Sequence, residues 1–109
     1  MDLKFRKDGN ATILEISGRL DTSNYESFSE ELFKKLEAGD KYIVVDMEDL
    51  EYISSSGLRV FLAALKKIRE KEGDIALCCM SKSINEVFEI SGFSTIFKIY
   101  VKMDDALAK

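Results

Sequence analysis

The first seventeen residues carry two short segments in which apolar and polar side chains alternate. Leu3 and Phe5 stand between charged neighbours, and a second alternating segment covers residues 11–17. A period of two is typical of a strand with one exposed face. Asp8-Gly9-Asn10 supplies turn residues between the segments, so the pattern predicts an antiparallel hairpin that Gly18 ends.

Two longer segments change to the period of an amphipathic helix, with apolar residues at three- and four-residue steps. The first follows Thr22 or Ser23, one of which we expect as the N-cap, and runs to Leu36. The second begins at the serine run 54–56 and is expected to end at Gly73. Its apolar stripe comprises Leu58, Phe61, Leu62, Leu65 and Ile68.

Continuous apolar runs over residues 42–45 and 75–80 predict two further strands. Such runs, rich in β-branched residues, fit strands that are covered on both faces, as in a parallel sheet. We expect residues 48–53 to form a loop. Shorter patterns predict a helix around residues 84–88, a strand over residues 97–100 and a short helix over residues 103–108.

The predicted order is therefore β-β-α-β-α-β-α-β-α, which indicates the α/β class. A hairpin that leads into right-handed βαβ units gives a mixed, mostly parallel sheet with helices packed against it. The chain has 109 residues, of which 46% are hydrophobic. This length and composition suit one domain over residues 1–109 with one core.

Composition excludes several classes of function. Sixteen basic and twenty acidic residues give a net charge of −4, which opposes binding to nucleic acid or to an anionic membrane. The chain has no apolar run of about 20 residues and no signal-peptide pattern, so we expect a cytoplasmic protein. It also has no histidine, the usual general base and metal ligand, and we expect no enzymatic activity.

Neither the cysteines nor the acidic loop residues predict a metal site or a cofactor. Cys78 and Cys79 are neighbours inside an apolar stretch, a poor arrangement for a disulfide or a chelate. We expect both to be small buried side chains. Asp21, Asp46 and Asp49 are expected to be solvated loop residues rather than magnesium ligands.

Two predicted loops, residues 18–24 and 53–57, carry polar side chains after strands, where open α/β sheets place functional groups. In the second loop, Ser54-Ser55-Ser56-Gly57 comes directly before a long helix. These serines therefore lie where free backbone N–H groups and the positive end of the helix dipole point. The spacing matches neither a Walker phosphate loop nor a nucleophile elbow.

Two explanations of the serine run stay open. One serine can act only as an N-cap, which stabilises a helix by ~1 kcal/mol. Alternatively, a phosphorylated serine adds about −1.5 to −2 charges at the helix end that best tolerates negative charge. Arg59, one turn further along the helix, is placed to pair with such a phosphate.

Several segments together resemble a known family. They are residues 16–21 (Ile-Ser-Gly-Arg-Leu-Asp), 42–46 (Tyr-Ile-Val-Val-Asp), 52–59 (Tyr-Ile-Ser-Ser-Ser-Gly-Leu-Arg) and 88–93 (Phe-Glu-Ile-Ser-Gly-Phe). In this order they resemble the STAS domain and, more narrowly, the bacterial anti-sigma factor antagonists. The similarity runs over essentially the whole chain.

The resemblance implies regulation of transcription by partner switching. In this family the unphosphorylated antagonist binds an anti-sigma factor that is also a serine kinase, so that the sigma factor is released. Phosphorylation of one serine at the start of the second helix breaks the complex, and a PP2C-type phosphatase restores it. The resemblance thus implies two protein partners, no cofactor and no catalysis; we expect a monomer.

Matching the family pattern residue by residue places the phosphoacceptor at Ser55. Many members have aspartate directly before the acceptor, whereas this chain has Ser54. Ser54 and Ser56 stay open as alternative acceptors. The implied partner-binding surface comprises Asp21, Thr22 and Ser23 of the first loop with Ser54, Ser56, Gly57 and Arg59 of the second. The alternative function is a STAS module that docks without phosphorylation, for example in a lipid-transport complex.

Overall fold

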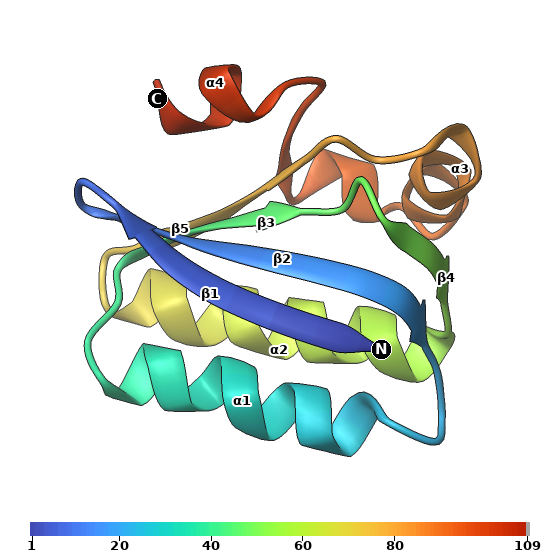
Figure 1. The fold of residues 1–109 in the computed structure, drawn as a ribbon, viewed down its shortest axis with the longest axis horizontal. Coiled ribbons are helices and arrows are strands. Elements are labelled where there is room, and N and C mark those ends of the chain that lie inside the picture. The colour runs from blue at the N-terminus through green and yellow to red at the C-terminus, as the bar shows by residue number, and fades with distance from the viewer. Residues whose placement is uncertain (109) are drawn as a thin grey trace.

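A sheet of six strands forms the centre of the structure, a computed structural model that describes residues 1–108 (Figure 1). The strands follow the order β1-β2-β3-β5-β6, and β4 pairs with β2 outside this order. Only β1 and β2 are antiparallel, so the predicted mixed, mostly parallel sheet is confirmed. The strands are β1 (Asp2–Asp8), β2 (Ala11–Leu20), β3 (Tyr42–Asp46), β4 (Leu50–Ile53), β5 (Asp74–Cys78) and β6 (Lys98–Tyr100).

Helices cover both faces of this sheet. The two long helices, α1 (Tyr25–Glu37) and α2 (Ser55–Glu70), lie side by side under one face (Figure 1). The short α4 (Met103–Leu107) lies over the opposite face, and α3 (Lys82–Ile90) lies near β4. A 3-10 turn, η1 (Phe93–Thr95), connects α3 to β6. Among the described residues, no helix combines the length and the apolar character needed to cross a membrane.

β2 changes its partner within its own length. Residues 12–15 pair with β3, and from Gly18 onward the strand pairs with β4, with a register shift between Gly18 and Arg19. Gly18 has φ +87°, a left-handed backbone that glycine adopts without steric cost, and its N–H donates to the Asp49 carbonyl at 3.0 Å. The end of β2 therefore lies beside the end of β4, with Leu20 opposite Ile53.

The prediction that residues 48–53 form a loop is wrong for their last four residues, which form β4. The sequence of this strand, Leu-Glu-Tyr-Ile, has neither an alternating nor a continuous apolar pattern, because only its first and last residues, Leu50 and Ile53, are buried and the two between them are exposed. Gly18 does not end β2 either, because it pairs with Leu50 and the strand continues to Leu20. The observed element order therefore has one strand more than the predicted order, and the predicted α/β class is confirmed.

The predicted helix boundaries need two corrections. The N-cap of α1 is Asn24, and Thr22 and Ser23 lie in the turn before it. The α2 helix ends at Glu70, three residues before Gly73. Gly73 is still required, because its N–H donates to the Ile68 carbonyl at 2.8 Å and a Cβ there would lie 2.2 Å from a backbone oxygen of the neighbouring chain segment.

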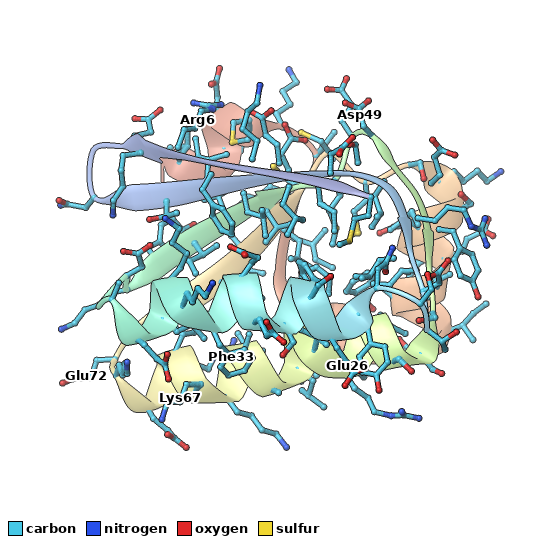
Figure 2. The ribbon with its side chains drawn as sticks, turned by 60° about the horizontal axis from the view of Figure 1, so that its bottom comes forward. Arg6, Glu26, Phe33, Asp49, Lys67 and Glu72 are labelled. Atoms are coloured by element: carbon cyan, nitrogen blue, oxygen red, sulfur yellow. The ribbon has the colours of Figure 1, made fainter. Side chains whose placement is uncertain are left out.

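The main core lies between the sheet and the two long helices. Three fully buried aromatic rings run through it: Phe28 and Phe61 have ring centroids 5.2 Å apart, and Phe61 and Phe88 6.4 Å apart. Phe33 lies at the boundary of α1 and α2 and is only partly buried (Figure 2). On α2, Leu62 is half-buried, and Val60 and Ala64 are buried in addition to the rest of the predicted stripe. Charged side chains such as Glu26 and Lys67 point away from the sheet (Figure 2).

A smaller core lies on the opposite face, under α4. Its buried residues are Ala11, Ile13, Tyr42, Val44, Ala76, Cys78 and Ala106. The Tyr42 hydroxyl donates to the Ala106 carbonyl at 2.6 Å, which ties α4 to the sheet. Cys78 is fully buried as predicted, but Cys79 is only half-buried.

Truncating the central ring of the main core tests this packing. We expect Phe61→Ala to lower the free energy of unfolding by about 3–5 kcal/mol, because it removes contacts with two other rings and leaves a cavity. The measurement is urea denaturation followed by circular dichroism. Phe33→Ala is the matched control, since the same atoms are lost from a partly buried ring, and an equal loss in both variants would contradict the assignment of the core.

Candidate functional site

The pairing of β2 with β4 brings the two loops singled out in the sequence into one place. Arg19 lies opposite Tyr52 and Leu20 opposite Ile53 in this pairing. Directly beyond it, the N–H of Ser54 donates to the Leu20 carbonyl at 2.9 Å. The loop after β2 and the start of α2 are therefore neighbours, joined by backbone hydrogen bonds rather than by side chains alone.

Ser54 is the N-cap of α2. Its hydroxyl oxygen accepts a hydrogen bond from the N–H of Gly57 at 3.2 Å, and its carbonyl accepts from Leu58 at 3.0 Å. The side chain is buried, with 8% of the residue exposed. Ser54 therefore has the capping role that a serine at this position is expected to play.

Ser55 and Ser56 form the first turn of α2 and are left free by this cap. Ser55 is exposed and Ser56 is half-buried. Neither hydroxyl has a hydrogen-bond partner among the described residues. Their backbone N–H groups stand in the first turn, where a helix offers no internal acceptor. The Ser55 hydroxyl thus faces solvent at the positive end of a helix of 16 residues.

Gly57 is buried and takes no part in the exposed surface. A Cβ at this position would lie 2.8 Å from the Leu20 Cγ and 3.0 Å from the Ile53 Cγ1. Real Cβ atoms are hardly ever this close to another carbon, so the first turn of α2 packs against the ends of β2 and β4 only because residue 57 has no side chain. Gly57 sets the position of the serines.

Asp21 organises the neighbouring loop. Its carboxylate accepts hydrogen bonds from the Ser23 hydroxyl at 2.6 Å and the Ser23 N–H at 3.0 Å, and these bonds lower the pKa of Asp21. The Asn24 amide adds a bond to the Arg19 carbonyl at 2.9 Å and accepts from the Asp21 N–H at 2.9 Å. Thr22 and Ser23 are exposed at the tip of the turn that results.

An arginine–tyrosine pair borders the site, and sequence reasoning did not select it. The Arg19 guanidinium lies 4.3 Å from the centre of the Tyr52 ring and 3.9 Å from an Asp21 carboxylate oxygen. Tyr52 is 41% exposed, which is unusual for a large aromatic side chain. The contact between Arg19 and Tyr52 depends on the register of β2 and β4. The sequence could therefore predict it only if β4 had also been predicted.

Arg59 is exposed on α2, one turn after Ser55, and forms no ion pair with a described residue. Positions four apart lie on the same face of a helix, so its guanidinium can reach a charged group attached to Ser55. Arg59 therefore supplies positive charge on the face of α2 that carries Ser55.

The structure does not gather the three aspartates that were considered as magnesium ligands. Asp46 and Asp49 line the same surface groove, whereas Asp21 takes part in the loop described above. The Asp46 carboxylate accepts from the N–H of Glu48 at 3.1 Å. The site around Ser55 therefore contains exposed hydroxyl groups, a carboxylate and two guanidinium groups, a set suited to binding and covalent modification of a surface.

Comparison with known proteins places this arrangement in a family. The family model described as the STAS domain matches residues 2–106. BtrV of Bordetella bronchiseptica, provisionally named an anti-sigma factor antagonist, is 36% identical over 108 residues, covering 99% of this chain and 93% of the relative.

Solved structures agree. A Thermotoga maritima crystal structure, also provisionally named an anti-sigma factor antagonist, has a TM-score of 0.93 at 25% identity and covers 97% of this chain and 92% of its own. The anti-sigma factor antagonist SpoIIAA in its unphosphorylated form has the same fold, with a TM-score of 0.83 at 18% identity over 97% and 93% of the two chains. The chain therefore belongs to the STAS-domain family and, within it, to the anti-sigma factor antagonists.

Proposed function

We propose that this antagonist works by partner switching controlled at Ser55. In its unphosphorylated form it binds an anti-sigma factor that is also a serine kinase, and phosphorylation of Ser55 releases it. A PP2C-type phosphatase restores the binding form. The observation that carries the proposal is that Ser55 is exposed at the start of α2, beside the loop that Asp21 organises, and that its hydroxyl has no hydrogen-bond partner among residues 1–108.

The environments of the three serines favour Ser55 over its neighbours. A kinase must reach the hydroxyl oxygen, and the Ser54 oxygen is buried and engaged by the Gly57 N–H. The Ser56 hydroxyl has no partner in the described part of the chain, but Ser56 is half-buried. Of the three, only Ser55 is exposed with a hydroxyl that bonds to none of the residues that the structure describes. Modification there costs the domain no existing interaction.

A phosphate on Ser55 would fit the folded domain. It adds about −1.5 to −2 charges next to the unsatisfied N–H groups of the first turn and the positive end of the helix dipole. Arg59, four residues along, can form charge-assisted hydrogen bonds with the phosphate oxygens. We therefore expect phosphorylation to change the surface while leaving the fold intact.

The same charge would act against a partner that covers this surface. Burying a dianion at an interface without a matching cation costs several kcal/mol, enough to change an affinity by orders of magnitude. In this proposal Asp21, Thr22, Ser23, Ser56 and Arg59 contact the anti-sigma factor around Ser55. Ser54 and Gly57, both buried, act by holding α2 in place.

Binding by position-55 variants tests the switch. The experiment captures proteins from the native host with wild-type, Ser55→Ala and Ser55→Asp chains and identifies them by mass spectrometry. We expect one kinase-like protein to bind the wild type and Ser55→Ala, and its binding to Ser55→Asp to weaken by roughly 100-fold or more, as several kcal/mol of uncompensated charge implies.

Ser83→Asp is the matched control for this experiment, because Ser83 is an exposed serine in the first turn of another helix, α3. It should bind as the wild type does. If Ser55→Asp also binds like the wild type, the switch is refuted. If instead the captured partner is a transporter subunit and position 55 has no effect, the chain is a docking module that works without phosphorylation.

Single substitutions of the serines should affect the stability of the domain and its phosphorylation independently. We expect Ser54→Ala to lower the free energy of unfolding by ~1 kcal/mol, because the cap of α2 is lost, and to leave phosphorylation in place. Ser55→Ala should leave stability unchanged and abolish phosphorylation by the captured kinase. Urea denaturation and phosphosite mapping provide the measurements; a phosphate found on Ser54 or Ser56 of the wild type would refute the choice of Ser55.

A further inference from the structure

Cys79, directly after β5, has a backbone conformation that its sequence neighbours do not explain. Its φ is +64°, in the left-handed region that residues with a Cβ adopt at a steric cost. The other non-glycine residue with positive φ, Glu72, follows the C-cap of α2, where left-handed residues commonly end helices. Cys79 ends no helix, and glycine or asparagine would occupy the position with less strain.

The strained residue brings two thiols to the same side of the sheet. Side chains of consecutive residues in an extended strand point to opposite faces. Here both Cys78 and Cys79 contact the small core under α4, because the left-handed residue breaks the alternation. The sequence-based expectation that neighbouring cysteines form a poor chelate assumed a regular strand.

Two further side chains reach the thiols. A carboxylate oxygen of Asp46, opposite Cys78 in the pairing of β3 with β5, and the two Sγ atoms all lie within 4.8 Å of one another. The Met103 Sδ, at the start of α4, lies 4.0 Å from the Cys78 Sγ. Three soft sulfur atoms and one carboxylate thus converge from three separate elements.

The spacing of these atoms suits a metal ion. Metal–sulfur bonds of about 2.3 Å place three sulfur ligands in a trigonal arrangement about 4.0 Å apart. The Met103 Sδ lies 4.0 Å from the Cys78 Sγ, and the two Sγ atoms lie within 4.8 Å of each other, so both pairs are close to this spacing. Two thiolates and a thioether are soft ligands of the kind that select Cu⁺. Zn²⁺ would instead use the Asp46 oxygen, since thioether sulfur is a poor ligand for it.

We propose that Cys78, Cys79 and Met103 form a binding site for one Cu⁺ ion. Asp46 stands beside the site as a nearby negative charge rather than as a ligand. Cys79 and Met103 are half-buried and give the ion access, whereas Cys78 is fully buried. The bound ion would join the ends of β3 and β5 to α4, the helix that covers the small core.

The two thiols are protonated in the absence of metal. Burial raises the pKa of both Cys78 and Cys79, so neither is a reactive thiolate near neutral pH. Binding of the cation displaces one proton from each of the two thiols, and both protons go to solvent, whereas the Met103 thioether binds without losing a proton. The ion enters and leaves as Cu⁺, so that neither the metal nor the sulfur changes its oxidation state.

The test is a competition titration of the reduced chain under anaerobic conditions. Free thiols are first counted to confirm two per chain, and Cu⁺ is then offered as its coloured bicinchoninate complex. We expect the wild type to withdraw one Cu⁺ per chain. Cys79→Gly should bind Cu⁺ at least roughly 100-fold more weakly than the wild type. The removal of groups that merely support a metal ligand already lowers metal affinity by about 10–100-fold. Met103→Leu should also weaken binding, and Asp46→Asn should not.

Cys79→Gly also keeps the proposal testable if other cysteine variants fail to fold. Glycine relieves the left-handed strain, so without metal this variant should melt at or above the temperature of the wild type, and added Cu⁺ should raise the melting temperature of the wild type only. Met80→Leu is the matched control for Met103→Leu, since Met80 is a half-buried methionine outside the cluster. Wild-type affinity in Cys79→Gly refutes the site. Loss of Cu⁺ binding in Asp46→Asn but not in Met103→Leu refutes Met103 as the third ligand in favour of Asp46.

Discussion

The site depends on the pairing of β2 with β4, which begins where β2 bends at Gly18 and leaves β3. Without this exchange of partner, the loop after β2 and the start of α2 would follow different strands and have no reason to meet. The hydrogen bond from the Ser54 N–H to the Leu20 carbonyl continues the pairing by one residue, directly into the N-cap. The position of α2 is thus determined by the sheet and not by the loops.

The buried and the exposed residues of this site have different roles. Ser54 and Gly57 are buried and fix the first turn of α2, one by capping it and the other by letting it approach Leu20. Ser55, in contrast, is exposed on a surface bordered by Asp21 and Arg59. A rigid frame with a free hydroxyl on it suits a switch that must change binding without changing the fold. Neighbouring serines can thus have opposite roles because they differ in burial.

Periodicity was sufficient to predict the α/β class and every long element, because helices and buried strands repeat their pattern over many residues. It failed for β4, whose four residues are buried only at the two ends. The Arg19–Tyr52 contact was out of reach for the same reason, since it follows from the register of that strand. Cys79 shows another limit, because a left-handed residue reverses the facing of a side chain and leaves no mark on the pattern.

The shortness of α4 has a consequence for how the molecule opens. A helix of five residues has almost no stability of its own, so α4 persists only while Ala106 and the Tyr42 hydroxyl hold it on the sheet. The main core, on the other face, does not require it. The α4 helix is therefore expected to unfold locally as a separate unit, with amide protons that exchange with solvent long before those of the central strands.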